Sequence, residues 1–455
     1  MDTFDIIVIG MGPGGEHVAG TLAERGLRVL GVDHGLVGGE CPYWGCIPSK
    51  MMVRAGDVLA EARRVDGLAG AVGDVRPDWS VVARRIRDEA TDDWNDRAAV
   101  ERFTKKGGTF VRGTGRIVGA GRVDVDGKPY AAERGIVVNA GSRAAIPPIE
   151  GLDAVPYWTN RGLIEAKELP GSLVVLGGGA IGCELGQAVA RFGVDVTIVE
   201  SGPRLLSAEE PEASEKLAVV FEREGIEVCT GVAASRVSGG DGGVEVTLDD
   251  GTSLSAERIL VATGRVTDPG AVGLGSVGVP EDARVAPIDE RCRVTSNVWA
   301  IGDLTGKGAF THVSMYQAGI VIRDVLGQDG PAADYAAVPR VTFTDPEIGA
   351  VGLTQAKARD GGLEVTVGVT PLGETTRGWI HGVGEDGFIK LVADPARGVL
   401  VGATVMGPYA GEILGALAVA VHAKVPVETL SSMIYAYPTF HRGIETALAD
   451  LKGHA

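Results

Sequence analysis

Residues 5–15 have the sequence DIIVIGMGPGG, and this stretch decides the fold. Its first half is short, apolar and rich in β-branched residues, which is typical of a buried parallel strand. Glycines follow in the spacing G-x-G-x-x-G, then a helical pattern over about 16–25 and a second strand over 28–33. The N-terminus is therefore predicted to form a βαβ unit that binds a nucleotide.

Each glycine of this first fingerprint has its own physical role. Gly10 allows the turn out of the strand, Gly12 lets a pyrophosphate approach the backbone, and Gly15 lets helix and strand pack closely. The N-terminus of the helix then stabilises the phosphate charge. Asp33 ends the second strand 23 residues after Gly10, where a carboxylate can accept a hydrogen bond from a ribose hydroxyl. Alone the match is weak, because an ordinary glycine turn gives the same pattern.

The same pattern returns in residues 173–200. A strand is followed by a second fingerprint and a helix, and the next strand ends at Glu200, again 23 residues after the first glycine. Two matches with identical offsets indicate an internal duplication and two dinucleotide sites. The charge of Glu200 repels a 2′-phosphate, so NADH is predicted for the second site. Arg204 leaves NADPH as the alternative. The glycines of this fingerprint are Gly177, Gly179 and Gly182.

Composition narrows the class of protein. The chain has 455 residues, a formal charge of −17 and five cysteines. The acidic balance argues against nucleic acid or an anionic membrane as partner, and no 18-residue window is apolar enough to span a bilayer. Five cysteines in so long a chain do not make a disulfide framework. We expect a cytoplasmic enzyme with several domains and predict no metal site.

The rest of the chain follows the α/β pattern and then changes character. A charged, helix-like stretch at 77–106 and an antiparallel layer at 109–138 lie between the two fingerprints. Beyond Pro339 an α+β pattern is predicted, with strands near 340–343, 364–368, 387–393 and 399–406 and helices at 411–422 and 440–450. Strands at 258–264 and 298–303 and a helix at 315–326 precede it.

The most specific stretch is 38–50, GGECPYWGCIPSK. With it the chain resembles the class I pyridine nucleotide-disulfide oxidoreductases, which include dihydrolipoamide dehydrogenase, glutathione reductase and mercuric reductase. The resemblance covers nearly the whole length and includes ATGR at 262–265, AIGD at 300–303 and FTDPEIG at 343–349. It implies FAD in the first fingerprint, NAD(P)H in the second, and a redox-active disulfide between Cys41 and Cys46.

Geometry sets a condition on that disulfide. Residues five apart in a regular α-helix have Cα atoms about 8.7 Å apart, whereas a disulfide needs roughly 4.4–6.8 Å. The helix must therefore be distorted between the cysteines, and Pro42 and Gly45 would permit this. A strained pair is easily reduced, which suits catalysis. The alternative is two buried free thiols.

The resemblance also implies roles for single residues. Cys41 corresponds to the exposed cysteine that attacks substrate, and Cys46 to the thiolate that lies against the flavin. Lys50 matches the lysine near flavin N5 and Glu184 its acidic partner; a cation there stabilises reduced flavin and thiolate. The implied FAD-binding residues include Asp33 on the adenosine half and Asp303 on the ribityl chain. Further predicted cofactor-binding positions are Gly141, Gly264 and Gly302.

The C-terminus departs from the family pattern. Disulfide reductases of the family end in His-Pro-Thr-x-x-Glu, and this chain has YPTFHR at 437–442. Tyr437 replaces the histidine that acts as acid/base across the dimer, and a tyrosine is a poor proton acceptor at neutral pH. His441 would serve instead if one helical turn presents it inward; otherwise it packs at the dimer interface. Arg442, in place of the glutamate, would attract an anionic substrate or lower the thiol pKa of Cys41.

Two further features bear on the substrate. A tyrosine at this place and the stretch 47–55 resemble mercuric reductase, but that enzyme uses an additional C-terminal cysteine pair and no cysteine follows Cys292 here. Mercury reduction is therefore not expected. Tyr43 and Trp44 either line an aromatic slot or belong to the core.

The predicted fold is α/β, with two Rossmann-like nucleotide-binding domains and a C-terminal α+β dimerisation domain. The FAD domain is expected at 1–145 and 266–336, the NAD(P) domain at 146–265, and the interface domain at 337–455 of a homodimer. The predicted activity passes electrons from NAD(P)H through FAD and the cysteine pair to a disulfide or other thiol-reactive small molecule. The alternatives are a quinone, dye or metal-ion reductase and a dihydrolipoamide dehydrogenase-like subunit.

Overall fold

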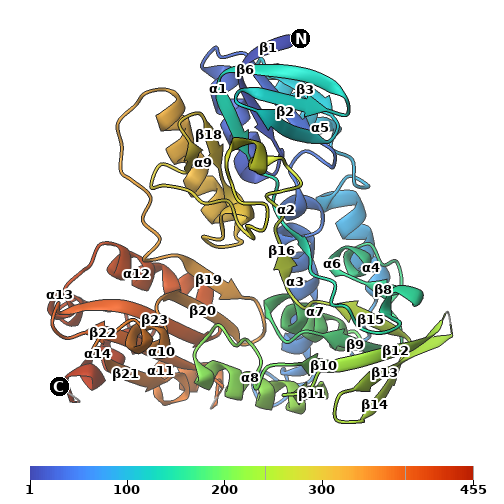
Figure 1. The fold of residues 1–455 in the computed structure, drawn as a ribbon. Coiled ribbons are helices and arrows are strands. Elements are labelled where there is room, and N and C mark those ends of the chain that lie inside the picture. Colours follow the sequence, from blue (N-terminus) through green and yellow to red (C-terminus); the bar gives the residue numbers. More distant parts are fainter. Residues whose placement is uncertain (241, 385, 454–455) are drawn as a thin grey trace. The chain divides into compact units, whose positions relative to one another are not determined.

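The computed structural model describes residues 1–240, 242–384 and 386–453. The chain forms two compact units, each assembled from three segments. Its mixed helices and strands confirm the predicted α/β class (Figure 1). The three-domain division, with an NAD(P) domain at 146–265 and an interface domain at 337–455, stays a prediction. Unit 1 comprises 1–51, 83–145 and 264–335, and unit 2 comprises 52–82, 146–263 and 336–455.

Unit 1 is built on an eight-stranded sheet. At its centre β1 (Asp2–Ile9) pairs in parallel with β2 (Val29–Asp33) and β6 (Lys128–Val138). The strand order continues through β18 (Val298–Ala300) and β17 (Arg293–Thr295) at one edge and β3 (Thr109–Arg112) at the other. Outside this order, β5 (Arg122–Val125) pairs with β6, and β4 (Gly115–Gly119) pairs with β5. Ile6, Ile7 and Val8 are fully buried, because a central parallel strand is covered on both faces.

Helices follow the first strand and fill the stretch 77–106. Helix α1 (Pro13–Glu24) connects β1 to β2 and packs against α9 (Thr311–Val325). It begins three residues earlier than predicted, because Pro13 occupies the first turn, where proline is favoured. The stretch 77–106 forms α4 (Trp79–Arg85), a π-helical turn (Ile86–Ala90) and α5 (Arg97–Lys105).

Unit 2 repeats the βαβ arrangement in its middle segment, 146–263. A five-stranded parallel sheet has the order β11 (Glu227–Thr230), β10 (Asp195–Glu200), β9 (Ser172–Leu176), β15 (Arg258–Val261) and β8 (Tyr157–Trp158). Helix α7 (Ala180–Ala190) connects β9 to β10, and α8 (Pro211–Arg223) connects β10 to β11. A three-stranded antiparallel sheet joins β12 (Ala234–Gly240), β13 (Gly243–Leu248) and β14 (Ser253–Ala256).

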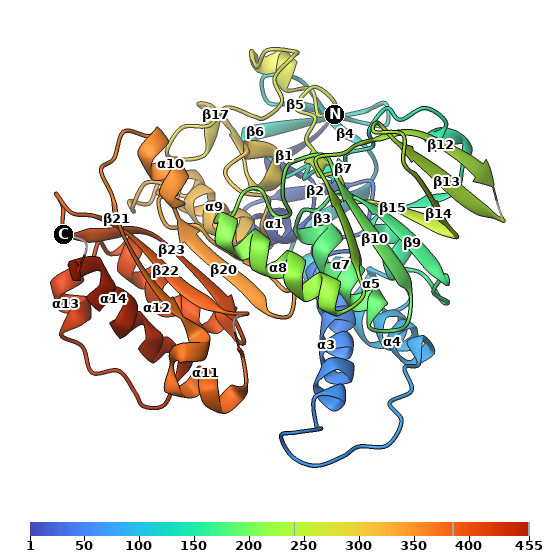
Figure 2. The same cartoon turned by 90° about the horizontal axis from the view of Figure 1, so that it is seen from below.

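The C-terminal segment, 336–455, also belongs to unit 2 and carries an antiparallel sheet (Figure 2). Its order is β19 (Pro339–Thr342), β20 (Glu347–Gly352), β23 (Val399–Gly407), β22 (Phe388–Asp394) and β21 (Thr366–Pro371). Every residue of β22 and β23 is buried, since α12 (Ala410–His422) and α14 (Gly443–Gly453) pack against this sheet. The smaller helices here are α10 (Gln355–Asp360), α11 (Thr376–His381) and α13 (Val427–Ser431).

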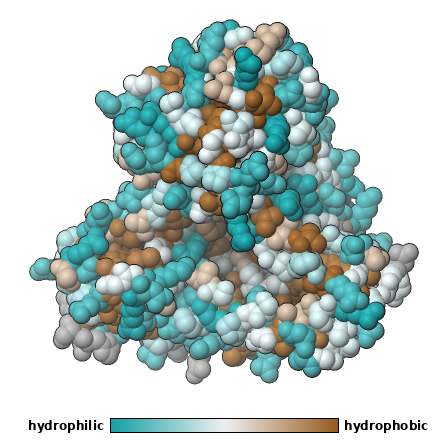
Figure 3. Space-filling model, viewed as in Figure 1, coloured by the Kyte–Doolittle hydropathy of each residue, from teal (hydrophilic) through white to brown (hydrophobic). Residues whose placement is uncertain are grey.

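Most of the visible face is hydrophilic, with separate hydrophobic patches between (Figure 3). Among the described residues, no helix combines the length and the apolar character that crossing a membrane requires.

Candidate active site

The first glycine fingerprint forms a cradle that only glycine can build. Gly10 has a φ of +91°, and a Cβ on it would lie 2.3 Å from the carbonyl oxygen of Asn139. A Cβ on Gly15 would lie 2.0 Å from the carbonyl oxygen of Gly10, so helix and strand pack backbone to backbone. Gly12 is the N-cap of α1, where the helix N-terminus favours an anion. These residues fit the pyrophosphate of a dinucleotide.

The second fingerprint repeats this geometry. Gly177 has a φ of +110°, and its Cβ would lie 2.4 Å from the carbonyl oxygen of Ala262. A Cβ on Gly182 would again lie 2.0 Å from the first glycine's carbonyl oxygen. A Cβ on Gly179, the N-cap of α7, would meet no atom within 4 Å. That open space above a helix N-terminus fits a second pyrophosphate.

The two predicted ribose-binding acids are held alike. One carboxylate oxygen of Asp33 accepts a hydrogen bond from the Met11 N–H at 2.6 Å, and the other accepts from the Gly35 N–H at 2.7 Å. Glu200 accepts from the Gly178 N–H at 2.7 Å and from the Gly202 N–H at 2.6 Å. Both carboxylates are therefore fixed beside their fingerprints.

The cysteines lie on two helices, not one. Helix α2 (Glu40–Tyr43) ends before Trp44, and α3 (Cys46–Arg63) begins at the second cysteine. The predicted interruption of the helix is therefore confirmed. A Cβ on Gly45 would lie 3.2 Å from the Cα of Cys41, so glycine lets the chain fold back closely. Both cysteines carry free thiols, and a hydrogen bond joins their side chains.

Electrostatics distinguishes the two thiols. The pKa of Cys46 is lowered to about 6, first by the hydrogen bond from Cys41, then by the hydroxyl of Thr311 and the charge of Lys50, while burial opposes the shift. The same hydrogen bond and burial raise the pKa of Cys41. Near neutral pH Cys46 is thus the thiolate, and Cys41 keeps its proton.

Thr311 is a site residue that the sequence did not reveal. Its Oγ1 lies 3.5 Å from the Sγ of Cys46. It is the first residue of α9, a helix that the sequence pattern predicts only from residue 315. Residue 311 lies outside every element predicted from the sequence. The sequence therefore offers no reason to place this threonine near the cysteines.

Lys50 and Glu184 occupy well-defined places in separate units. Lys50 lies one turn into α3, and its Nζ donates to the Ser49 hydroxyl at 3.3 Å. Glu184 is buried in the second turn of α7, and its Oε1 accepts a hydrogen bond from the Phe343 N–H at 2.8 Å. The two belong to unit 1 and unit 2 respectively, and their pairing stays a prediction.

Asp303 is fixed by residues from two other segments. The Ser142 hydroxyl donates to its Oδ2. The Arg265 guanidinium in turn donates to the hydroxyl of Ser142 at 2.7 Å and to its carbonyl oxygen at 2.6 Å. This network lies where β7 (Arg143–Ala144) and β16 (Arg265–Val266) pair. Gly141, Gly264 and Gly302 have φ values of +68°, +116° and +73° beside it.

The C-terminal residues correct one prediction. Tyr437 does not share a helical turn with His441, because the helical residues begin only at Phe440. Tyr437 is 65% exposed, and its hydroxyl donates to the Thr376 Oγ1 at 3.3 Å. Arg442 lies over the Tyr437 ring at 5.5 Å. The helical turn assumed between Tyr437 and His441 is therefore wrong, and the catalytic roles of Tyr437 and His441 stay predictions.

The two aromatic residues between the cysteines differ in burial. Tyr43 is buried, and its hydroxyl donates to the carbonyl oxygen of Val37 at 3.2 Å. It therefore belongs to the core. Trp44 is half-buried, with its ring 5.8 Å from that of Tyr43.

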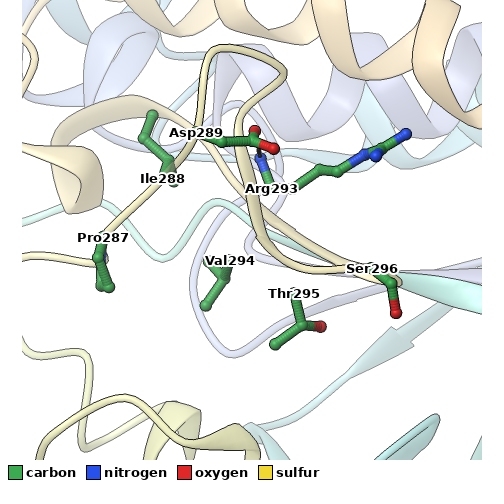
Figure 4. A pocket seen from close by; sticks show the side chains of 7 residues that line it. All are labelled: Pro287, Ile288, Asp289, Arg293, Val294, Thr295 and Ser296. Carbon is green, nitrogen blue, oxygen red and sulfur yellow. Dashed lines mark hydrogen bonds between the residues drawn. The ribbon is translucent and has the colours of Figure 1, made fainter.

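An open hollow elsewhere on unit 1 has a volume of about 480 Å³ (Figure 4). Two of its polar side chains are engaged within the protein: the Asp289 carboxylate accepts a hydrogen bond from the backbone N–H of Arg293, and the Arg293 guanidinium pairs with Asp324. None of its lining residues belongs to the predicted site. The lining residues are Pro287, Ile288, Asp289, Arg293, Val294, Thr295 and Ser296.

Comparisons with known proteins agree with this geometry. The family model of pyridine nucleotide-disulphide oxidoreductases matches residues 4–318, and the model of their dimerisation domain matches 338–448. A dihydrolipoyl dehydrogenase of Chlorobaculum tepidum is 33% identical over 98% of this chain and 97% of its own. A mercuric reductase of Lysinibacillus sphaericus is 30% identical over 98% and 82%.

Among solved structures, the chain resembles a variant of the HOCl-induced flavoprotein disulfide reductase RclA from Escherichia coli in complex with Cu(II). The TM-score is 0.85 at 25% identity, over 100% of this chain and 99% of that one.

Proposed function

Because this chain belongs to the pyridine nucleotide-disulphide oxidoreductase family, we propose that it uses NADH and FAD to reduce the Cys41–Cys46 pair and, through it, a small-molecule acceptor. The family is one of NAD(P)H-dependent flavoenzymes, and the dihydrolipoyl dehydrogenase and mercuric reductase relatives are oxidoreductases. FAD, when bound, supplies the two-electron carrier between nicotinamide and cysteines. The residues of this chain bind the cofactors and control the protons of the cysteine pair.

The asymmetry of the two thiols carries the proposal. Two electrons and two protons convert the oxidised disulfide into two thiols, and the local electrostatics releases one proton from Cys46 near neutral pH. The Cys41 proton is held between the two sulfurs, which keeps Cys46 a thiolate. When an acceptor takes the electron pair through Cys41, the Cys46 thiolate is placed to close the disulfide again.

The second fingerprint favours NADH over NADPH. Glu200 presents a fixed negative charge where a 2′-phosphate would lie. Arg204, the residue that leaves NADPH open, donates its terminal N–H groups to four acceptors in and beside its own loop. Its guanidinium is therefore engaged within the protein, which supports selectivity for NADH.

The acceptor is proposed as a disulfide or another thiol-reactive small molecule. Tyr437 in place of the family's histidine favours a second candidate, a quinone, dye or metal-ion reductase, since such acceptors need no imidazole base at the interchange thiol. The structural likeness to a Cu(II) complex of a disulfide reductase also points this way. A dihydrolipoamide dehydrogenase-like subunit is the third candidate.

We further propose that the protein works as a homodimer in the cytoplasm. The C-terminal segment matches the family's dimerisation domain. It exposes large apolar side chains, with Trp379 77%, Tyr409 57% and Ile434 98% exposed. A second copy would cover such side chains.

Turnover of an acceptor panel by the purified yellow protein tests the proposal. The panel holds lipoamide, glutathione disulfide, a quinone and Cu(II), and the variants are Cys41→Ser and, as a control, Cys229→Ser. We expect Cys41→Ser to lose disulfide turnover, while Cys229→Ser retains it because Cys229, on β11 of unit 2, is not a member of the pair. Full disulfide turnover by Cys41→Ser would overturn the proposal. Quinone or Cu(II) turnover that survives Cys41→Ser would select the second candidate.

A further inference from the structure

The loop 201–210 follows Glu200 and contacts both this acid and the second fingerprint. The N–H of Gly202 donates to the Glu200 carboxylate at 2.6 Å. The N–H of Leu206 donates to the carbonyl oxygen of Gly178 at 2.9 Å, although Leu206 takes a φ of +46° that leucine rarely adopts. The loop therefore positions both the acid and the glycine turn of the proposed NADH site.

Arg204 holds this loop together from inside. One terminal nitrogen donates to the carbonyl oxygen of Leu206 at 3.2 Å and to the hydroxyl of Ser214 at 2.6 Å. The other donates to the carbonyl oxygens of Ser207 at 2.9 Å and Glu209 at 2.8 Å. Since the two terminal nitrogens carry four N–H groups, all four are used.

The far end of the loop is held by the C-terminal segment. Arg340 on β19 forms a two-pronged ion pair with Glu209, at 2.7 and 2.8 Å. Lys390 on β22 pairs with Glu210 at 2.9 Å, and these two side chains are only 2% and 1% exposed. Figures 1 and 2 both show α8, which follows this loop, beside the strands of the C-terminal segment.

We propose that Arg340 and Lys390 are positioning residues for nucleotide selectivity, an inference that rests on the proposed NADH site. By fixing Glu209 and Glu210, they keep the loop in the shape in which Arg204 binds its own backbone. Glu200 is then the charged group that meets the adenosine ribose. Loss of the Arg340–Glu209 pair would loosen the loop and free Arg204 to bind a 2′-phosphate.

Calorimetric titration of the FAD-loaded protein tests this without turnover. The probes are ADP-ribose, which carries the adenosine half of NADH, and its 2′-phosphorylated form. Arg340→Met should weaken ADP-ribose binding and shift the ratio of the two affinities toward the phosphorylated probe by about fivefold. Adding Arg204→Met should abolish that shift, because the freed guanidinium causes it.

Arg223→Met is the matched control. Arg223 also joins the middle segment to the C-terminal segment, through Asp386, but at the other end of α8. It should leave both affinities unchanged. Hydrogen exchange of the 201–210 amides gives a second measurement, which should quicken in Arg340→Met and not in Arg223→Met. If Arg340→Met does not fold, Glu209→Gln tests the same pair.

The outcomes separate the inference from the proposed function. Wild-type selectivity and exchange rates in Arg340→Met and in Glu209→Gln would overturn the inference alone. A shift that survives Arg204→Met would overturn the part assigned to Arg204. Wild-type protein that binds neither probe would overturn the proposed NADH site and this inference with it.

Discussion

The two βαβ modules, β1–α1–β2 and β9–α7–β10, share nearly the same geometry at their glycines and acids. In each, the third glycine lies against the carbonyl oxygen of the first. In each, the acid that ends the second strand accepts from the residue after the first glycine and from the residue two positions beyond itself. The duplicated part is therefore the dinucleotide cradle.

The modules differ in the segment that comes after the second strand. After β2 the chain turns through Gly38 and Gly39 into α2 and α3, which carry the cysteines. After β10 it forms the loop 201–210, which Arg204 binds together. On the proposed function, the same cradle serves two tasks, because the segment beyond the acid would supply redox chemistry in one case and nucleotide selectivity in the other.

The largest effects should come from breaking each cradle separately. Gly15→Ala should yield protein without FAD, whereas Gly182→Ala should yield yellow protein whose affinity for NADH is about a hundredfold lower. The new Cβ would meet a backbone oxygen at 2.0 Å, and relieving such overpacking costs ~3 kcal/mol. Flavin absorbance and NADH titration measure both effects.

Gly186→Ala, also on α7, is the control. Its Cβ would meet Ile198 at 3.4 Å, an ordinary contact, so binding should change little. Loss of both cofactors from either cradle variant would show that the modules are not independent.

A smaller effect should distinguish the two acids. Glu200→Gln removes the charge that repels a 2′-phosphate and should reduce discrimination against NADPH about tenfold, or ~1.4 kcal/mol. Asp33→Asn in the other cradle should weaken FAD binding and leave that discrimination unchanged. Steady-state kcat/KM for the two nucleotides measures the ratio. An equal shift in both variants would contradict the assignment of one nucleotide to each module.

The smallest effect concerns the segment unique to the first module. The pKa of Cys46 is lowered to about 6, so on the proposed function the charge-transfer absorbance of its thiolate with bound flavin should be present above that pH and lost as the pH falls through it. Thr311→Val removes one hydroxyl that stabilises the thiolate, so the midpoint should rise by about one pH unit or less. Thr295→Val, at a hydroxyl bonded to Asn297, should leave it in place. A midpoint that falls in Thr311→Val would be inconsistent with this role.

The fold and the cradles could be predicted because their signals are local. Spacing alone located both glycine turns and both acids. Because cysteines five residues apart in a regular helix lie too far apart for a disulfide, the sequence also required the break that the structure has between Tyr43 and Cys46. Residues brought in from distant segments carried no such signal. Thr311 comes from α9, whose start shows no side-chain cap, and Ser142 meets Asp303 and Arg265, which lie 161 and 123 positions further along the chain.

In the C-terminal segment, too, some features could not be predicted from the sequence. Strand β20 is not predicted from the sequence, because its run follows Pro346 and contains two glycines. The expectation for His441 assumes a helix through Tyr437, but Thr439 is extended and the helical residues start after it. A spacing argument holds only where the assumed secondary structure is continuous.

Differential alkylation of the cysteines tests the central claim most directly. The air-oxidised protein and the protein reduced anaerobically with NADH are each denatured, alkylated and mapped by mass spectrometry. We predict that Cys41 and Cys46 are protected in the oxidised protein and become reactive after NADH, while Cys183, Cys229 and Cys292 react in both. Equal labelling of Cys41 and Cys46 before and after NADH would contradict the account.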